Sequence, residues 1–282
     1  MTSNYYYLVA GLPELLLDEG KQPLSSGDFL QDAAEQLDAA DLRILNLLRL
    51  PYDNKNLLSL LLKSEQPFDP RGSISEEALT AGLKFPDELP EYMQQFIEAF
   101  RENRSPAPGL VPDDQLAWFF YDAMLQQENE FIREWFTFDL QLRNAAAGIN
   151  CRKEFAHLEA LATERDKPVS SVIVGRDEVA EALLRSNAPD FGLSAIVPWA
   201  DRIFSLSRGS FPEFEKGIDS LRWEVLDEMT VDAYFRAETV MAFFIKLTIV
   251  ERWLTLEPAA GREWFDRLLE ELKASYSVPA DF

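Results

Sequence analysis

The single histidine of the chain is the residue best suited to acid–base chemistry or metal binding. Glu154 and His157 form one Glu-x-x-His motif, which on a helix places both side chains on one face. A di-iron site in a helical bundle needs two such motifs and two further glutamates, and a zinc site needs several Cys or His ligands. Because the chain has one His and one Cys, Cys151, neither site can be completed. We therefore expect an ordinary helix histidine and a small buried thiol.

Motifs for nucleotide or acyl chemistry are also incomplete. None of the 12 glycines forms a phosphate-binding loop, and no serine lies in a Gly-x-Ser-x-Gly elbow. Asp190-Phe191-Gly192 matches one kinase motif, but the other kinase motifs are missing, and we interpret it as a turn. We expect no catalytic residue, no cofactor and no metal. A carboxylate pair acting as acid and base stays open as an alternative.

Charged and polar side chains inside apolar helices are more informative. Asp139 and Arg143 lie four residues apart in an apolar stretch, and Asn144 follows them. Glu238 and Lys246 interrupt a second apolar stretch near the end of the chain. We predict that these residues form ion pairs that fix the register of the helices. Contact with a partner protein is the alternative.

The elements that must position these residues are helices. Apolar residues recur at helical spacing, and strands do not alternate with helices as in an α/β protein. A β-like run at 169–175 is too short to found a sheet. The sequence predicts an all-α, multi-helical fold, with the stretch at 113–164 as two long helices or one bent helix. The expected helices are 25–37, 42–51, 57–62, 75–84, 90–100, 113–164, 177–185, 211–229, 230–256 (capped by Thr230) and 259–276.

The first residues are the exception to this helical pattern. Residues 5–9 are aromatic, branched or large and apolar, which favours a strand, and Gly11 and Pro13 then break the run. We expect residues 1–24 to form a short extended segment packed on the helical body. A tyrosine-lined ligand site is the alternative. A secretion signal is not expected, because no Lys or Arg precedes Lys21.

Composition limits the possible partners. The 282 residues carry a formal net charge of −22, which disfavours binding to nucleic acid or to anionic lipid and favours basic proteins. No apolar run reaches the roughly 20 residues of a membrane span. One cysteine fits a reducing, cytoplasmic compartment. The Pro-rich stretch 103–112 is the clearest linker, and we expect three helical units, 25–105, 112–205 and 210–282, in one compact body.

Three stretches carry a family resemblance: YYYLVAGLPEL, FDLQLRNAAAGINCRK and AYFRAETVMAFFIKLTIVERW. They resemble a bacterial family encoded among V-type ATP synthase genes. That family is similar in turn to the C-type (also called d-type) subunit of V-type and A-type ATPases, which is built from pseudo-repeated helical units. Its repeat motif resembles the segment with Asp53 and Asn56, and the segment with Asp139, Arg143 and Asn144. A third copy, around Glu238, is degraded.

The resemblance implies a non-catalytic, funnel-shaped helical subunit. Such a subunit lies on the membrane rotor ring, receives the foot of the central stalk and couples the two during ion transport. It implies a place at the cytoplasmic face of the inner membrane, held there through protein contacts and without nucleic acid. Two alternatives remain: a helical scaffold for an unrelated basic protein, and a carboxylate-based enzyme around Glu154 and His157.

Overall fold

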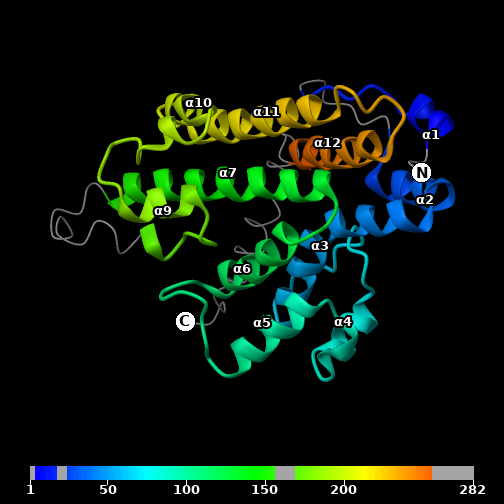
Figure 1. Cartoon of the computed structure of the whole chain (residues 1–282). Helices are drawn as coiled ribbons and strands as arrows, with labels where there is room; N and C mark the ends of the chain where they lie inside the picture. The colour runs from blue at the N-terminus through cyan, green and yellow to red at the C-terminus, as the bar shows by residue number, and fades with distance from the viewer. Residues whose placement is uncertain (1–3, 18–23, 156–168, 256–282) are drawn as a thin grey trace, which may run out of the picture. The chain divides into compact units, whose positions relative to one another are not determined.

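The described part of the chain consists of helices joined by turns and loops. The computed structural model describes residues 4–17, 24–155 and 169–255 (Figure 1). These ranges contain 11 α-helices, two short 3-10 helices and no strand, so the predicted all-α class is confirmed. The second β-like run, at 169–175, likewise contains no strand. None of the described helices has the length and apolar character needed to cross a membrane.

Contacts divide the chain into two compact units. Unit 1 combines residues 1–36 with residues 235–282, and unit 2 comprises Leu37–Tyr234. The division into three helical units that the sequence suggests stays a prediction. The described helices of unit 1 are α1 Tyr6–Gly11, α2 Ser26–Gln36 and α12 Ala237–Thr255.

The core of unit 1 lies between α2 and α12. Phe29 of α2 is fully buried, and its ring lies 5.3 Å from that of Phe243 and 5.9 Å from that of Phe244. At the other end of α12, the Glu251 carboxylate accepts a 2.7 Å hydrogen bond from the backbone N–H of Ser26. This bond satisfies a free N–H in the first turn of α2, which fixes where that helix begins.

The prediction of an extended N-terminal segment is wrong, because Tyr6–Gly11 form helix α1. A strand needs a neighbouring strand for its backbone hydrogen bonds, and the described chain offers none. A helix satisfies those groups internally. Tyr5 and Leu8 are buried, and the N–H of Tyr5 donates to the carbonyl of Phe235 at 2.7 Å. The segment does pack on the helices of unit 1, in helical rather than extended form.

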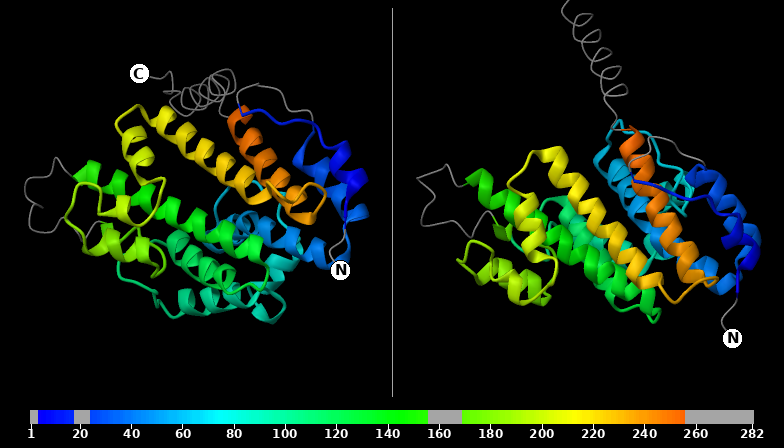
Figure 2. Two further views of the ribbon diagram at one scale, coloured as in Figure 1. Left: turned by 45° about the horizontal axis from the view of Figure 1, so that its top comes forward. Right: turned by 90° about the horizontal axis from the view of Figure 1, so that it is seen from above.

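Unit 2 is built around the long helix α7. Helix α7 packs against α3, α6, α9 and α11, and it runs beside α11 in both views of Figure 2. The elements of unit 2 are α3 Ala39–Leu62, α4 Glu76–Gly82, η1 Pro86–Glu88, α5 Glu91–Arg101, α6 Pro112–Leu125, α7 Glu130–Phe155, α9 Glu178–Arg185, η3 Leu193–Ala195, α10 Ala200–Leu206 and α11 Phe211–Thr230.

Some helix boundaries differ from those predicted. Helix α3 continues through Pro51, where we expected an end, although a proline inside a helix removes one backbone hydrogen bond. Burial of Leu48, Leu50 and Leu57 on both sides of the proline holds the helix together. The long stretch from 113 forms two helices, α6 and α7. Thr230 ends α11 instead of starting a new helix, and α12 begins at Ala237.

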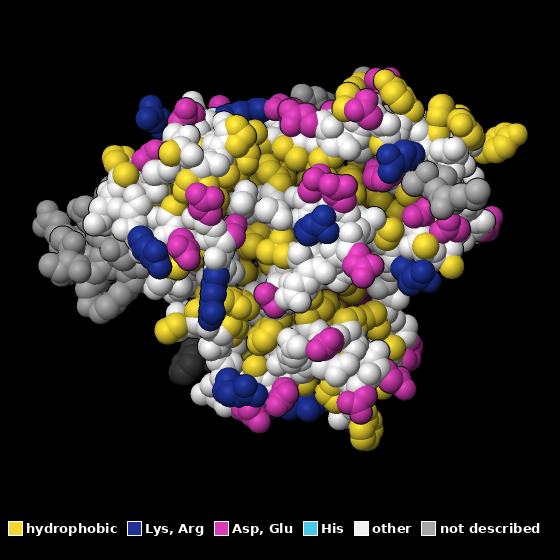
Figure 3. Space-filling view, viewed as in Figure 1, with side chains coloured by type: hydrophobic (Ala, Val, Ile, Leu, Met, Phe, Trp, Pro, Cys, Tyr) yellow, Lys and Arg dark blue, Asp and Glu magenta, His cyan; other side chains and the backbone are white. Residues whose placement is uncertain are grey.

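The surface is strongly charged but mixed. Figure 3 shows acidic and basic side chains interspersed among exposed hydrophobic ones on one face. The expected helix at 259–276 and His157 lie outside the described residues.

Candidate functional site

Two buried asparagines in unit 2 hold a loop to a long helix in the same way. The side-chain amide of Asn56 in α3 donates to the carbonyl of Asp69 at 2.9 Å and accepts from its N–H at 2.8 Å. The amide of Asn144 in α7 donates to the carbonyl of Val174 at 2.7 Å and accepts from its N–H at 3.0 Å. Each asparagine thus satisfies both backbone groups of one loop residue, as a neighbouring strand would. We call this arrangement the asparagine clamp.

A polar residue three positions earlier extends each clamp toward a short helix. Asp53 is fully buried, and it accepts hydrogen bonds from the N–H and hydroxyl of Ser73, both 2.9 Å, and from the N–H of Ile74, 3.0 Å. Helix α4 begins directly after this contact. In the second clamp the matching position is Gln141, which lies beside Asp177, the residue that caps α9.

The structure therefore changes the register of the repeat. The sequence pattern aligned Asp53 with Asp139, whereas the contacts match Asn56 with Asn144. In this register Asp53 corresponds to Gln141. The shared unit is a long helix with a buried asparagine, a clamped loop and a short helix, found once as α3–α4 and once as α7–α9.

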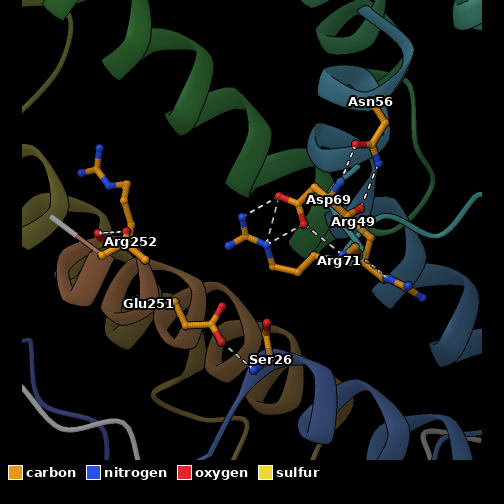
Figure 4. A network of polar contacts seen from close by, with 8 residues as sticks. Ser26, Arg49, Asn56, Asp69, Arg71, Glu251 and Arg252 are labelled. Atoms are coloured by element: carbon orange, nitrogen blue, oxygen red, sulfur yellow. Dashed lines mark hydrogen bonds and ion pairs between the residues drawn. The ribbon is translucent and has the colours of Figure 1, made fainter. Parts of the chain in front are cut away.

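Additional contacts tighten the first clamp (Figure 4). The Arg49 guanidinium donates to the carbonyls of Arg71, at 2.9 Å, and of Gly72. Arg71 in turn forms an ion pair with Asp69 at 2.6 Å. Gly72 is needed here because a methyl group at its Cα would overlap with the Asp53 carboxylate.

The burial of Asp53 should make the stability of the fold depend on pH in an unusual direction. Burial raises the pKa of Asp53 above its ordinary value, and the hydrogen bonds from Ser73 and Ile74 and the charge of Arg49 offset only part of this. A carboxyl whose pKa is higher in the folded state stabilises the fold below its unfolded pKa of about 3.9, and this contribution is lost as the pH rises through the folded pKa. The advantage of the native protein over Asp53→Asn, in free energy of unfolding, should therefore grow as the pH falls from 7 toward 4.

Urea unfolding of the two proteins at several pH values measures this advantage, and Glu88→Gln, at an exposed position of η1, serves as control. An advantage that shrinks on acidification would mean that the hydrogen bonds outweigh burial and that the pKa is lowered.

A second polar network joins three helices of unit 2. The Arg222 guanidinium in α11 donates to Asp139 of α7 at 2.9 and 3.1 Å, and to Asp219 at 3.1 Å. The hydroxyl of Tyr121 in α6 donates to the other Asp139 oxygen at 2.7 Å. Burial alone lowers the pKa of Arg222, but the two carboxylates outweigh it and hold the pKa above its ordinary value. Burial and the Asp139 charge raise the pKa of Tyr121 well above 10.0.

Asp139 and Arg143, four residues apart on α7, form ion pairs with different helices. Arg143 forms its ion pair with Asp114 of α6 and also donates to the carbonyl of Val172 at 3.4 Å. Burial raises the pKa of Asp114, which the Arg143 charge partly counteracts. Together the two residues tie α7 to α6 on one side and to α11 on the other.

The remaining candidates, Glu238 and Lys246, lie on α12 in unit 1. Glu238 accepts a 2.7 Å hydrogen bond from Arg236, and both side chains are partly exposed. Lys246 is half-buried. The acid of α12 that reaches another helix is Glu251, through Ser26 (Figure 4).

Unit 2 contains a pocket of about 330 Å³ that could hold a small substrate if the protein were an enzyme. Trp118, Phe119 and Tyr121 form an aromatic wall, and Asp122 and Asp177 supply carboxylates. Burial raises the pKa of Asp177, whose Oδ2 is buried without a hydrogen bond. This second oxygen of the Asp177 carboxyl can accept a hydrogen bond or hold a proton.

Other groups with chemical potential lie elsewhere. Cys151 is half-buried, and burial raises the pKa of its thiol, which lowers its reactivity. Asp190-Phe191-Gly192 forms a turn, as predicted, with Phe191 and Gly192 at positive φ. Among the described residues, no group of three or more His, Cys, Asp or Glu side chains could hold a metal ion.

Comparison with known families finds a match that covers nearly the whole chain. A family model described as "Protein of unknown function (DUF2764)" matches residues 1–276. The chain belongs to the DUF2764 family. No curated protein and no solved structure matches it.

Several polar residues of this DUF2764 protein were not predicted from its sequence: Arg222, Asp219, Asp114, Tyr121 and Arg49. Asp219 and Arg222 carry a local signal, since they lie three residues apart on a helix and form an ion pair. The pairing of Arg222 with Asp139 crosses 83 residues and gives no such signal. It becomes visible only once α7 and α11 lie side by side.

Proposed function

We propose that this DUF2764 protein is a non-catalytic subunit of a V-type ATP synthase or ATPase. By this proposal it resembles the C-type subunit and couples the central stalk to the membrane rotor ring during ion transport. It acts at the cytoplasmic face of the inner membrane, where other ATPase subunits hold it. The proposal starts from the sequence resemblance, and three properties of the molecule support it.

The recurrence of the asparagine clamp is the observation that carries the proposal. The resemblance implies a body of pseudo-repeated helical units. Unit 2 contains two such arrangements, centred on Asn56 and Asn144, with matching hydrogen bonds on each side. A repeat of this detail, in helices of different sequence, supports a duplicated helical architecture of the kind that the C-type ATPase subunit has.

Rigidity is the second supporting property. A subunit that carries torque must not let its helices slide. Buried or partly buried charge pairs have low tolerance for misplacement, because a separated pair leaves an uncompensated charge. The pairs of Asp139 with Arg222 and of Arg143 with Asp114 fix α7 against α11 and α6.

Charge is the third property. A net charge of −22 is complementary to a basic stalk foot or to basic loops of the rotor ring. Charge complementarity of this kind contributes mainly to the rate of encounter and to register. It also predicts that assembly weakens as salt is raised.

Affinity purification of the tagged full chain from gently solubilised native membranes tests the proposal. We expect stalk and rotor-ring subunits of the ATPase to co-purify at low salt and to be partly lost at high salt. An unrelated acidic protein that carries the same tag is the control. Absence of every ATPase subunit at low salt would contradict the proposal, and stable pairing with one unrelated basic protein would favour the scaffold alternative.

A further inference from the structure

We propose that the groove between α1 and α2 is a docking surface for a partner segment with a large apolar side chain flanked by Lys or Arg. The surface lies entirely within unit 1, and the proposed function enters only in the choice of the protein that supplies the segment.

Exposed aromatic side chains mark this surface. Tyr7 is 93% exposed and Tyr6 is 55% exposed, and neighbouring exposed rings of this kind form an apolar patch of the sort that marks interaction sites. The Tyr6 ring packs against that of Phe235, itself partly exposed, with centroids 4.6 Å apart. Figure 3 shows hydrophobic side chains gathered over α1. Tyrosine is enriched at protein interfaces because it combines a large apolar ring with a hydroxyl.

Beside the exposed rings lies a groove of about 310 Å³. Its lining comes from both helices and from the turn after α1, and its half-buried apolar residues are Leu12, Pro13 and Leu24. Tyr7 lies at its edge together with Asp32 of α2. A groove with this lining accepts an apolar side chain and places a carboxylate next to it.

The surface is held in place before any partner arrives. Tyr5 and Leu8 are buried, and the N–H of Tyr5 is hydrogen-bonded to Phe235. Helix α2 is fixed by the buried ring of Phe29 and by the bond from Ser26 to Glu251. A preformed surface binds with a smaller entropy cost than one that must order on binding.

Charge determines which occupant fits. Asp28, Asp32 and Glu35 are exposed at helical spacing along one side of α2. Residues 4–17 and 24–36 contain no Lys or Arg, and Arg236, which follows Phe235, is paired with Glu238. This acidic border repels anionic lipid headgroups, which argues against a membrane as the occupant. It attracts a protein segment whose apolar anchor is flanked by basic side chains.

Site-specific photo-crosslinking of the full chain in native membranes tests the inference. The photoreactive residue p-benzoylphenylalanine replaces Tyr7, and in a matched control it replaces Phe85, which is 75% exposed in unit 2. We expect the crosslinking yield from position 7 to be at least about fivefold that from position 85, because aromatic anchors near the centre of an interface contribute most of its binding energy. The captured segments should contain a large apolar residue flanked by Lys or Arg.

Charge variants complete the experiment. Adding Asp32→Asn and Glu35→Gln to the position 7 protein should lower the yield about threefold at low salt, as loss of border charges slows association. Adding Asp87→Asn and Glu88→Gln, which are exposed in unit 2, should leave it unchanged. The inference would be overturned by equal crosslinking from positions 7 and 85, or by capture of segments without net positive charge. It would also be overturned if the yield did not change when Asp32 and Glu35 are replaced.

The identity of the captured protein separates this inference from the proposed function. A basic, apolar segment of an ATPase subunit supports both. The same kind of segment from an unrelated protein supports the docking surface and contradicts the proposed function. ATPase subunits that co-purify without crosslinking at position 7 overturn the docking surface alone.

Discussion

Replacing Arg222 by Met should lower the free energy of unfolding by about 3 kcal/mol, the lower end of the range for removing one partner of a buried ion pair, because its side chain is 23% exposed. The loss is large because Arg222 serves two carboxylates at once. Asp219 is 1% exposed and would lose its ion pair with Arg222, and Asp139 would lose two hydrogen bonds from the guanidinium while it keeps the one from Tyr121. Equilibrium unfolding in urea, followed by tryptophan fluorescence, measures the change.

The same substitution at Arg202 is the matched control. Arg202 in α10 also pairs with a carboxylate of α11, Glu224, but the two side chains are 41% and 54% exposed. An exposed pair contributes at most about 1 kcal/mol, so Arg202→Met should change the stability only slightly. If both arginine variants unfold at the same urea concentration, the network around Arg222 does not hold α7 to α11 in the way described.

The second large effect is expected at the asparagine clamp of α7. Asn144 is fully buried, and Asn144→Ala removes the hydrogen-bond partners of the N–H and of the carbonyl of Val174. Each unsatisfied buried group costs about 1–3 kcal/mol, so losing the partners of two such groups should lower the free energy of unfolding by about 2–6 kcal/mol. Hydrogen exchange gives a local measurement, because the Val174 amide should exchange much faster in the variant.

The two clamps provide an internal comparison. Asn56→Ala should give the smaller loss, because the loop around Asp69 is only partly buried and water can reach the freed groups. Gln126→Ala, at an exposed position of unit 2, should have almost no effect. Unchanged exchange of the Val174 amide in Asn144→Ala would show that the clamp does not hold this loop.

Much of the fold is encoded locally and could be predicted. The helical spacing of apolar residues predicts an all-α chain, and polar residues inside such helices identify Asp139, Arg143 and Asn144 as unusual. Their partners could not be predicted, since Asp114, Val174 and Arg222 become neighbours only through packing of helices distant in the sequence. An i,i+4 spacing suggested a link between Asp139 and Arg143, whereas in the structure Asp139 pairs with Arg222 and Arg143 pairs with Asp114.

Two predictions failed for related physical reasons. Residues 5–9 have side chains typical of strands, but side-chain preference is weaker than the need of the backbone for partners, and a helix supplies these without a sheet. The repeat was aligned on Asp53 and Asp139 because the motif of the resembled family begins with an aspartate. The contacts show that the asparagine performs the shared task, while the residue three positions earlier varies between Asp53 and Gln141.

Coupling between ATP hydrolysis and ion transport tests the central claim most directly. The gene for this chain is deleted in its native host, and ATP-driven ion uptake is measured in inverted membrane vesicles beside the ATPase activity of the detached catalytic head. The proposed role predicts that uptake is lost while the head still hydrolyses ATP, and that the native chain restores uptake. Vesicles that transport ions at the normal rate without the chain would contradict the account.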